Sequence, residues 1–440
     1  MADDALHDRM REDWNRRARE DAEYYVAFGR HEQDDREFFA TAHEVVYGLE
    51  YDLRRLHSPR LKGLEIGCGP GRLMHFMSRH FHEIHGVDVS DEMLKRARAK
   101  LAAVPNAHVH LTSGSSLAQF PDESFDMVYS YAVFQHIPSR EVVLSYLLEA
   151  RRVLKTGGLL WFQVNGLPQP PIVVDTWSGV RFKPEEILQF ARDNDFQVYT
   201  LEGAYTQYMW TSWRKRPDGW NAAIHHQRPP SHTQVIRISN PYSHEPVVPD
   251  RGRLACASVW VENLPDECGL NHLEVLMEGR PGTPNYISVA LPHGQQQINV
   301  LLPTGTRTGL VPVEIKWAGE PLCADAVMRV IPAGPRAPKI LSVTDAIDLM
   351  AGTRILNDAV KVTVEELDLA QSFEVQVDGR RIPLVDVLCV EPRAPRHELT
   401  VRLDNAVEAG VHHLELHVGL RRFPPIPIEV VKGQASPAPF

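Results

Sequence analysis

Short apolar runs alternate with amphipathic, charged stretches between residues 61 and 215 of this chain. Runs of this length, separated by helix-period segments, predict parallel strands joined by helices. The expected strands are Leu61–Ile66, Ile84–Asp88, Ala107–Leu111, Phe125–Ser130, Leu159–Val164, Phe196–Glu202 and Thr206–Arg214, and the expected helices are Leu73–His80, Glu92–Ala103, Val142–Leu154 and Pro184–Asp193. Lys155–Gly158 is expected to end the third of these helices as a glycine stop. The pattern predicts a doubly wound α/β sheet with its first strand in the centre.

The pattern changes to an alternation of period two from about residue 231, with frequent Gly and Pro. The segment at residues 273–280 recurs at 373–380, and the segment at 309–317 recurs at 410–418. A repeat of about 100 residues made of short alternating strands predicts two all-β sandwiches. We place them at residues 231–333 and 338–432, on either side of the linker Pro332–Pro338.

Residues 1–57 have many helix formers and aromatic residues between charges, which predicts two or three amphipathic helices. They are either a lid over a binding site or a plain helical extension packed on the next domain. The α/β domain itself is placed at residues 58–217.

Composition narrows the classes of function. The 440 residues carry 57 acidic and 47 basic side chains, a net charge of −10, which argues against nucleic acid as the main partner. We find no apolar run long enough to span a membrane and no signal peptide, and therefore expect a cytoplasmic protein. The five cysteines are scattered without a C-x-x-C pair, so neither a disulfide framework nor a metal site is predicted.

The strongest chemical signal is the glycine turn after the first strand, Gly67-Cys68-Gly69-Pro70-Gly71. Glycines allow a sharp turn and close approach of a ligand, and the following helix start is expected to offer free N–H groups. Glu65 lies within the strand, where a carboxylate suits an amino-bearing cation rather than a pyrophosphate. Asp88 closes the second strand, where it can accept the two hydroxyls of a ribose.

These motifs, with Phe125–Ser130, Phe134–Pro138 and Arg152–Gly158, resemble the class I S-adenosylmethionine-dependent methyltransferases from about Leu61 to Lys215. The resemblance implies a Rossmann-like sheet of seven strands in the order 3214576, and S-adenosylmethionine as cofactor. It also implies roles for individual residues. The methionine part would be held by Glu65, Gly67, Cys68, Gly69, Gly71 and Tyr131, the ribose by Asp88, and the adenine by Val89, Met93, Gly114 and Ser115. Ser115 stands where the family usually has an acid, which leaves the contact to the adenine amino group open. Tyr25 is the expected contact from the leader.

Acceptor chemistry is less defined. His136 follows the fourth strand and is either a general base or a structural histidine, and Trp177, Arg181 and Tyr208 are candidate acceptor residues. The expected reaction is methyl transfer to an O or N atom of a small molecule or glycan. A protein or peptide methyltransferase and a non-enzymatic cofactor-binding protein are the alternatives. The two β modules resemble immunoglobulin-like, TIG-type repeats, which predicts a protein or glycan partner for them.

Overall fold

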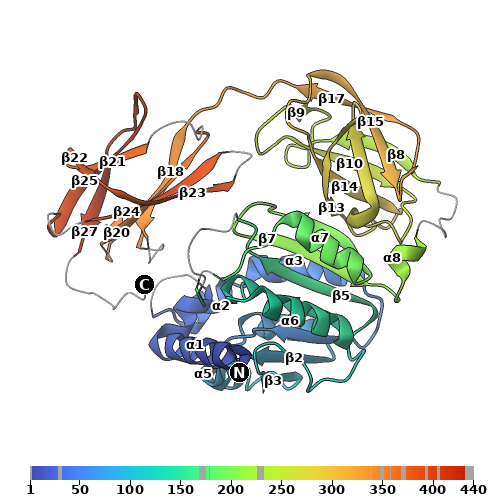
Figure 1. Ribbon diagram of the computed structural model, residues 1–440, viewed down its shortest axis with the longest axis horizontal. Helices are drawn as coiled ribbons and strands as arrows, with labels where there is room; N and C mark the ends of the chain where they lie inside the picture. Colours follow the sequence, from blue (N-terminus) through green and yellow to red (C-terminus); the bar gives the residue numbers. More distant parts are fainter. Residues whose placement is uncertain are drawn as a thin grey trace. The chain divides into compact units, whose positions relative to one another are not determined.

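The computed structural model describes residues 2–27, 32–167, 175–177, 179–224, 232–346, 351–356, 358–367, 373–391, 395–403 and 407–431 (Figure 1). The chain forms two compact units, one of Met1–Glu20 with Ala42–Ala333 and the other of Asp21–Thr41 with Gly334–Phe440. The predicted leader of residues 1–57 is therefore divided between the units. Its helices are α1 (Ala2–Ala27), α2 (Asp35–Ala40) and α3 (His43–Leu53).

The division falls at a break inside α1. Asp21 leaves the helical region, with φ −167° and ψ 88°. Its carboxylate then accepts hydrogen bonds from the backbone N–H groups of Tyr24 (3.0 Å) and Glu32 (2.9 Å). A carboxylate that binds the N–H three residues on is a helix N-cap, so a new helical segment starts here.

The first unit is built on the predicted α/β sheet. Its strands are β1 (Lys62–Ile66), β2 (Glu83–Asp88), β3 (Ala107–Leu111), β4 (Phe125–Ser130), β5 (Leu154–Val164), β6 (Phe196–Glu202) and β7 (Met209–Lys215), in the order β3-β2-β1-β4-β5-β7-β6. The first five are parallel, and β7 runs antiparallel to both β5 and β6. Every residue of β4 is buried, as expected for a central strand with both faces covered. The helices α5 (Asp91–Lys100), α6 (Arg140–Val153) and α7 (Pro184–Asp193) flank this sheet (Figure 1), and α4 (Arg72–Met77) follows β1.

The glycine stop predicted at Lys155–Gly158 is wrong. Helix α6 ends at Val153, and β5 begins at Leu154, which pairs with Phe125. The register then shifts before the next pair, Met127 with Leu159. This bulge accommodates Gly157 at φ +87°. The two glycines therefore interrupt a strand instead of ending a helix.

The sheet continues beyond β6 into the first β module. It extends through β13 (Thr283–Ile287), β14 (Gln295–Leu301), β10 (Cys256–Glu262) and β8 (Gln234–Ser239) to eleven strands. Tyr286 of β13 pairs antiparallel with Thr200 of β6. The sequence predicted a separate sandwich here, but β6 would then be an open edge with unpaired backbone groups. One apolar core accordingly runs from Met10 to Val330.

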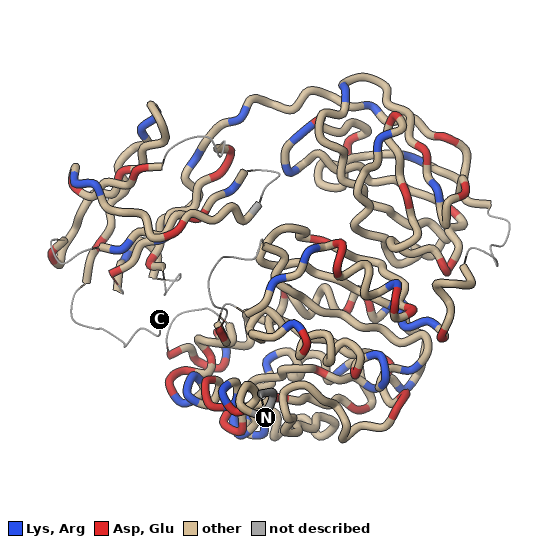
Figure 2. Tube along the Cα trace, viewed as in Figure 1, with Lys and Arg blue, Asp and Glu red and all other residues tan. Residues whose placement is uncertain are grey.

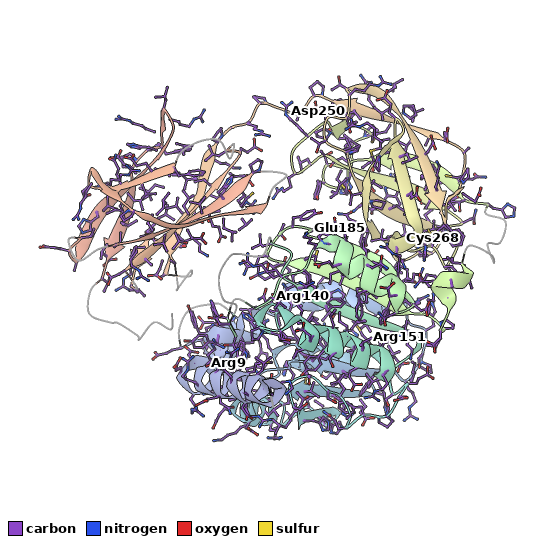
Figure 3. The ribbon with its side chains drawn as sticks, in the orientation of Figure 1. Arg9, Arg140, Arg151, Glu185, Asp250 and Cys268 are labelled. Carbon is purple, nitrogen blue, oxygen red and sulfur yellow. The ribbon has the colours of Figure 1, made fainter. Side chains whose placement is uncertain are left out.

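Polar side chains reinforce this junction. Arg55, which is 7% exposed, donates to the backbone carbonyls of Ile287 (2.5 Å) and Ser288 (3.4 Å). On the other side, Gln197 of β6 donates to the carbonyls of Asp266 (2.7 Å) and Cys268 (2.9 Å), the latter labelled in Figure 3. The first β module is thus a structural part of the α/β domain.

The two β modules have equivalent strands. In the first module the second sheet has the order β12-β11-β15-β17-β9, with β16 on β15. The second module has the sheets β18-β20-β24-β23 and β19-β27-β25-β21-β22, with β26 on β25. The remaining bounds are α8 (Trp220–Ala223), β9 (Val248–Pro249), β11 (Leu273–Met277), β12 (Arg280–Pro281), β15 (Gly309–Trp317), β16 (Glu320–Pro321), β17 (Ala326–Ile331), β18 (Lys339–Asp345), β19 (Arg354–Ile355), β20 (Ala359–Glu365), β21 (Phe373–Val377), β22 (Arg380–Ile382), β23 (Leu384–Glu391), β24 (Arg396–Arg402), β25 (Gly410–Val418), β26 (Arg421–Arg422) and β27 (Ile426–Val430). Adding ten to the number of a strand in the first module gives its counterpart in the second.

The repeat also preserves its turns. Glu278 and Gly279 both have positive φ (53° and 74°), as do Asp378 and Gly379 (49° and 77°). Two successive residues with positive φ make the hairpin turn that matches the twist of the strands, which explains the recurring glycine. The predicted module boundaries at residues 231 and 432 lie outside the described residues.

Charges of both signs are interleaved along α1 (Figure 2). Within the described ranges, no helix is both long enough and apolar enough to cross a membrane.

Candidate functional site

The glycine turn wraps around the carboxyl end of β2. The N–H groups of Gly67 and Cys68 both donate to the carbonyl of Val87 (2.8 and 3.0 Å), and the N–H of Gly69 donates to Asp88 Oδ2 (2.9 Å). Positive φ at Gly67 and Gly69 (73° and 50°) allows this path. These three N–H groups bind the protein itself, so the turn offers its shape and the two carboxylates beside it. The free N–H groups expected at the start of the following helix stay a prediction.

Gly71 and Cys68 have packing roles in this turn. Gly71, with φ +85°, precedes α4, and a Cβ there would lie 2.8 Å from a methyl of Leu101. Cys68 is buried, and burial raises the pKa of its thiol. Its side chain fills the space that Gly86 leaves open, since a Cβ at Gly86 would lie 2.8 Å from Cys68 Sγ. Cys68 therefore fits a packing residue better than a nucleophile.

Glu65 is a buried carboxyl group in the middle of the sheet, 3% exposed. The hydroxyl of Tyr129 on β4 donates to its Oε2 (2.9 Å). Burial raises the pKa of Glu65 to about 8, and the hydrogen bond from Tyr129 and the nearby charge of Arg72 oppose this rise. Neither Tyr129 nor Arg72 was among the site residues predicted from the sequence. The group can ionise readily when a cation arrives, because the cation compensates its loss of water.

Asp88 ties the glycine turn to the start of α5. Its Oδ2 accepts from Gly69 N–H, and its Oδ1 accepts from Ser90 N–H (2.9 Å). Burial raises the pKa of Asp88 to about 6, so the carboxylate is mainly ionised at neutral pH. Ser90 caps α5 by accepting from Met93 N–H (3.1 Å), which leaves Asp88 free of the capping role. A carboxylate has about four lone-pair sites, so Asp88 keeps acceptor capacity for a hydroxyl beside the N–H groups that it binds.

Val89 and Gly114, two of the residues predicted for adenine, are neighbours just after β2 and β3. Met93 is buried, and Val89 Cγ1 lies 3.4 Å from the position of a Cβ on Gly114. The carbonyl of Ser115 accepts a hydrogen bond from Ser145 Oγ (3.0 Å).

Tyr131 and Tyr208 belong to an aromatic stack. Trp210 of β7 lies nearly parallel to Tyr131 (centroids 5.5 Å apart, 17°) and to Tyr208 (6.1 Å, 11°). The guanidinium of Arg72 lies over the Tyr131 ring at 5.2 Å. The stack thus joins a predicted cofactor residue to a predicted acceptor residue.

His136 is held in one tautomer by a chain of hydrogen bonds. Its Nδ1–H donates to the carbonyl of Trp177 (2.7 Å), since a carbonyl only accepts. Its Nε2 then accepts from the amide of Gln135 (3.2 Å), whose Oε1 accepts from Gln163 Nε2 (3.0 Å). Burial lowers the pKa of His136 to about 4, so the ring is neutral at pH 7. With its lone pair engaged by Gln135, His136 fits a positioning residue better than a general base, and the catalytic role stays a prediction.

The first part of α1 packs on this region. Trp14 meets the His136 ring edge-on (5.5 Å, 77°), and Arg17 lies over the Trp177 ring at 5.3 Å. Arg17 also donates to Thr176 Oγ1 (3.1 Å), which in turn donates to Asp13 (2.6 Å). These contacts support a covering role for residues up to Glu20. Tyr25 belongs to the other unit, so its predicted cofactor contact remains a prediction.

Arg181 is anchored through its backbone. Arg140, at the start of α6 and labelled in Figure 3, donates to the carbonyl of Arg181 (2.6 Å) and pairs with Glu186 (2.9 Å). Residue 181 also forms a bridge with Asn165 after β5. The segment with Trp177 and Arg181 is therefore held near the carboxyl end of the sheet.

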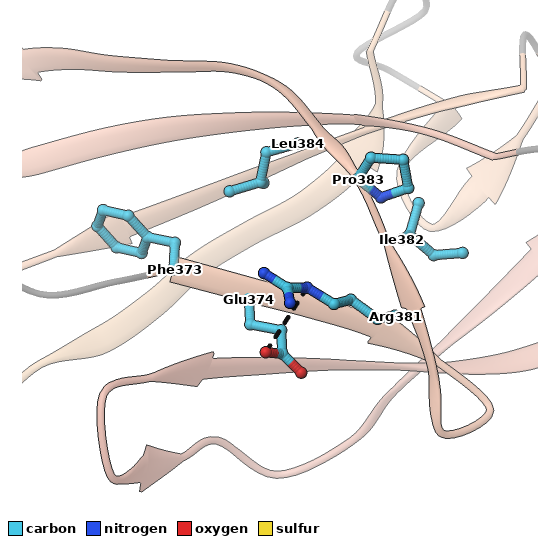
Figure 4. A pocket seen from close by; sticks show the side chains of 6 residues that line it. All are labelled: Phe373, Glu374, Arg381, Ile382, Pro383 and Leu384. Carbon is cyan, nitrogen blue, oxygen red and sulfur yellow. Dashed lines mark ion pairs between the residues drawn. The ribbon is translucent and has the colours of Figure 1, made fainter.

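The second unit has a cavity of its own, of about 370 Å³. Figure 4 shows Glu374 and Arg381 paired across it (3.7 Å) beside four mainly apolar residues. They are Phe373, Ile382, Pro383 and Leu384. The predicted protein or glycan partner of the modules stays a prediction.

Comparison with known proteins bears on the first unit. Residues 64–162 match the family described as methyltransferase domain. The match runs from β1 into β5 and includes Glu65, the glycine turn, Asp88 and His136.

Individual relatives match part of the chain. It is 33% identical over 114 residues to trans-aconitate 2-methyltransferase of Agrobacterium fabrum. The aligned residues cover 25% of this chain and 41% of that protein. It is 29% identical over 183 residues to 2-methyl-6-phytyl-1,4-hydroquinone methyltransferase of Synechocystis sp. The aligned residues cover 36% of this chain and 55% of that protein. Phosphoethanolamine N-methyltransferase 1 of Haemonchus contortus, solved with phosphoethanolamine and S-adenosylhomocysteine, aligns with a TM-score of 0.38 at 15% identity, covering 50% of this chain and 51% of that one. The chain spans about half the length of the curated relatives it matches.

Proposed function

We propose that the first unit transfers a methyl group from S-adenosylmethionine to an oxygen or nitrogen atom of a small-molecule or glycan acceptor. The observation that carries this proposal is the pair of buried carboxyl groups, Glu65 and Asp88, on adjacent strands beside a glycine turn within the methyltransferase match. The cofactor of this domain is S-adenosylmethionine.

The chemistry of the buried groups fits this cofactor. Glu65 would bind its amino group, because a buried carboxyl group with a raised pKa gains most from a cation. Asp88 would accept from the ribose hydroxyls through its remaining lone pairs. Tyr131, in the stack with Trp210, would line the methionine part. The bound cofactor supplies an electrophilic methyl group, and the protein supplies alignment and exclusion of water.

The acceptor would lie among Trp177, Tyr208 and His136. The hydrogen-bond chain from Gln163 through Gln135 to Trp177 fixes the His136 ring, which favours orientation of an acceptor over proton abstraction by His136. An acceptor with a lone pair, or a hydroxyl that releases its proton to water, needs no base of high pKa.

Calorimetric titration of the full chain with S-adenosylhomocysteine tests the cofactor site. We expect 1:1 binding, and we expect Asp88→Asn to weaken it at least tenfold, because it weakens an acceptor for both ribose hydroxyls and for the glycine turn. Asp91→Asn is the matched control, since it removes the same charge at an exposed position three residues away. Absence of binding to the wild-type chain would refute the proposal.

A further inference from the structure

One face of α1 follows the end of β2. His7, Arg11 and Asn15 are spaced by four residues and therefore share a face. Arg11 Nε donates to the carbonyl of Val89 (3.3 Å). Asn15 Oδ1 accepts from Ser90 Oγ (2.7 Å) and from Glu92 N–H (3.1 Å). The helix is thus bound to the segment that follows Asp88.

His7 brings its ring to the predicted adenine end of the site. A Cβ on Gly114 would lie 3.1 Å from His7 Cδ2 and 3.4 Å from Val89 Cγ1, so the ring and Val89 both border this glycine. The ring nitrogen Nε2 of His7 is buried and has no hydrogen-bond partner within the described part of the chain. A buried polar atom without a partner costs free energy, which a ligand atom in hydrogen-bond reach would offset.

The same place lacks the acid that the resemblance to methyltransferases predicts. Ser115 occupies that position, and its carbonyl already accepts from Ser145 Oγ. An exocyclic amino group bound there would need another acceptor. The unprotonated nitrogen of a neutral imidazole is such an acceptor.

We infer that His7 completes the base end of the cofactor site, its Nε2 accepting a hydrogen bond from the amino group of adenine. The inference rests on the proposed function. It makes the first helix a specificity element for the cofactor: the face with His7 binds the base, while Trp14 and Arg17 of the same helix contact His136 and Trp177.

The test uses calorimetric titration of the full chain with S-adenosylhomocysteine and with S-inosylhomocysteine, in which an oxygen replaces the amino group. We expect the wild-type chain to prefer the adenine compound about tenfold, the effect of one hydrogen bond to a buried group. His7→Phe keeps the ring but removes the nitrogen, so it should weaken S-adenosylhomocysteine about tenfold and bind both compounds alike. His7→Gln, which restores an acceptor, should recover part of the preference.

His57→Phe removes an exposed imidazole and serves as the control, with both affinities unchanged. Wild-type binding of both compounds with equal affinity, or an unchanged preference in His7→Phe, overturns the role of His7 and leaves the methyltransferase proposal standing. Tighter binding by His7→Ala also overturns it, because the ring would then occupy the space of the base. If the wild-type chain binds neither compound, the proposed function itself fails.

Discussion

The junction between the α/β domain and the first β module gives the most quantitative prediction. Arg55 is 7% exposed and pairs with the buried Asp52 (3.2 Å). It also donates to the carbonyls of Ile287 and Ser288 and lies over the Tyr199 ring at 3.9 Å. Arg55→Met keeps the aliphatic volume but leaves Asp52 without its ion-pair partner and removes a donor from the carbonyls of Ile287 and Ser288. Breaking a buried pair in this way costs about 3–5 kcal/mol.

A loss of about 4 kcal/mol should lower the unfolding temperature of a unit of roughly 300 residues by about 6 °C. Differential scanning calorimetry measures the shift, and hydrogen exchange of peptides from β6 and β13 locates it. Arg54→Met is the matched control, because the neighbouring Arg54 is exposed, and it should change the temperature by less than about 1 °C. Adding Asp52→Asn to Arg55→Met should recover part of the lost stability, because it removes the buried negative charge that has no ion-pair partner in the single variant. If Arg55→Met unfolds at the temperature of the control, the junction does not contribute as argued.

Two further predictions concern the cofactor carboxylate and the chain length. Burial holds the pKa of Glu65 near 8, so below that pH a cationic amine must displace its proton, and the affinity for S-adenosylhomocysteine should rise about tenfold from pH 6 to pH 7. Calorimetry in buffers of different ionisation enthalpy should detect this released proton. If the affinity of Glu65→Gln rises with pH as steeply as that of the wild-type chain, the proton does not come from Glu65. A chain ended after Ala333 should keep the first unit folded and able to bind S-adenosylhomocysteine, whereas one ended after Pro217 exposes β6 and should aggregate. Equal solubility and affinity of the two truncated chains would show that the first β module is not needed for the fold.

The sequence predicted those features that depend on local pattern. Strands such as Phe125–Ser130 and Phe196–Glu202 are short segments rich in apolar residues, and the structure has them with the same bounds. The repeat revealed the duplicated strands, because both copies keep the same turn and the same alternation. Glu65 and Asp88 could be predicted as site residues because a carboxyl group beside a glycine turn is visible in the local sequence.

Features that depend on docking were missed. The contact between His7 and Gly114 joins residues more than one hundred positions apart, and the only signal in the sequence is the spacing of His7, Arg11 and Asn15. The partners of Glu65 and His136 were missed for the same reason: Tyr129 follows from strand register. The break at Asp21, which separates Tyr25 from the first unit, has no proline or glycine to announce it.

The duplication explains how one kind of module serves two structural roles. In the first copy, the edge strand β13 pairs with β6 at Tyr286, and Arg55 reinforces this edge. In the second copy the equivalent strand is β23, which among the described strands pairs with β24 alone. Valines 385 and 387 of β23 are exposed, at 61% and 40%. The same fold thus closes the edge of the α/β sheet in one copy and belongs to a separate unit in the other, because the first copy is the one that Arg55 and Gln197 bind.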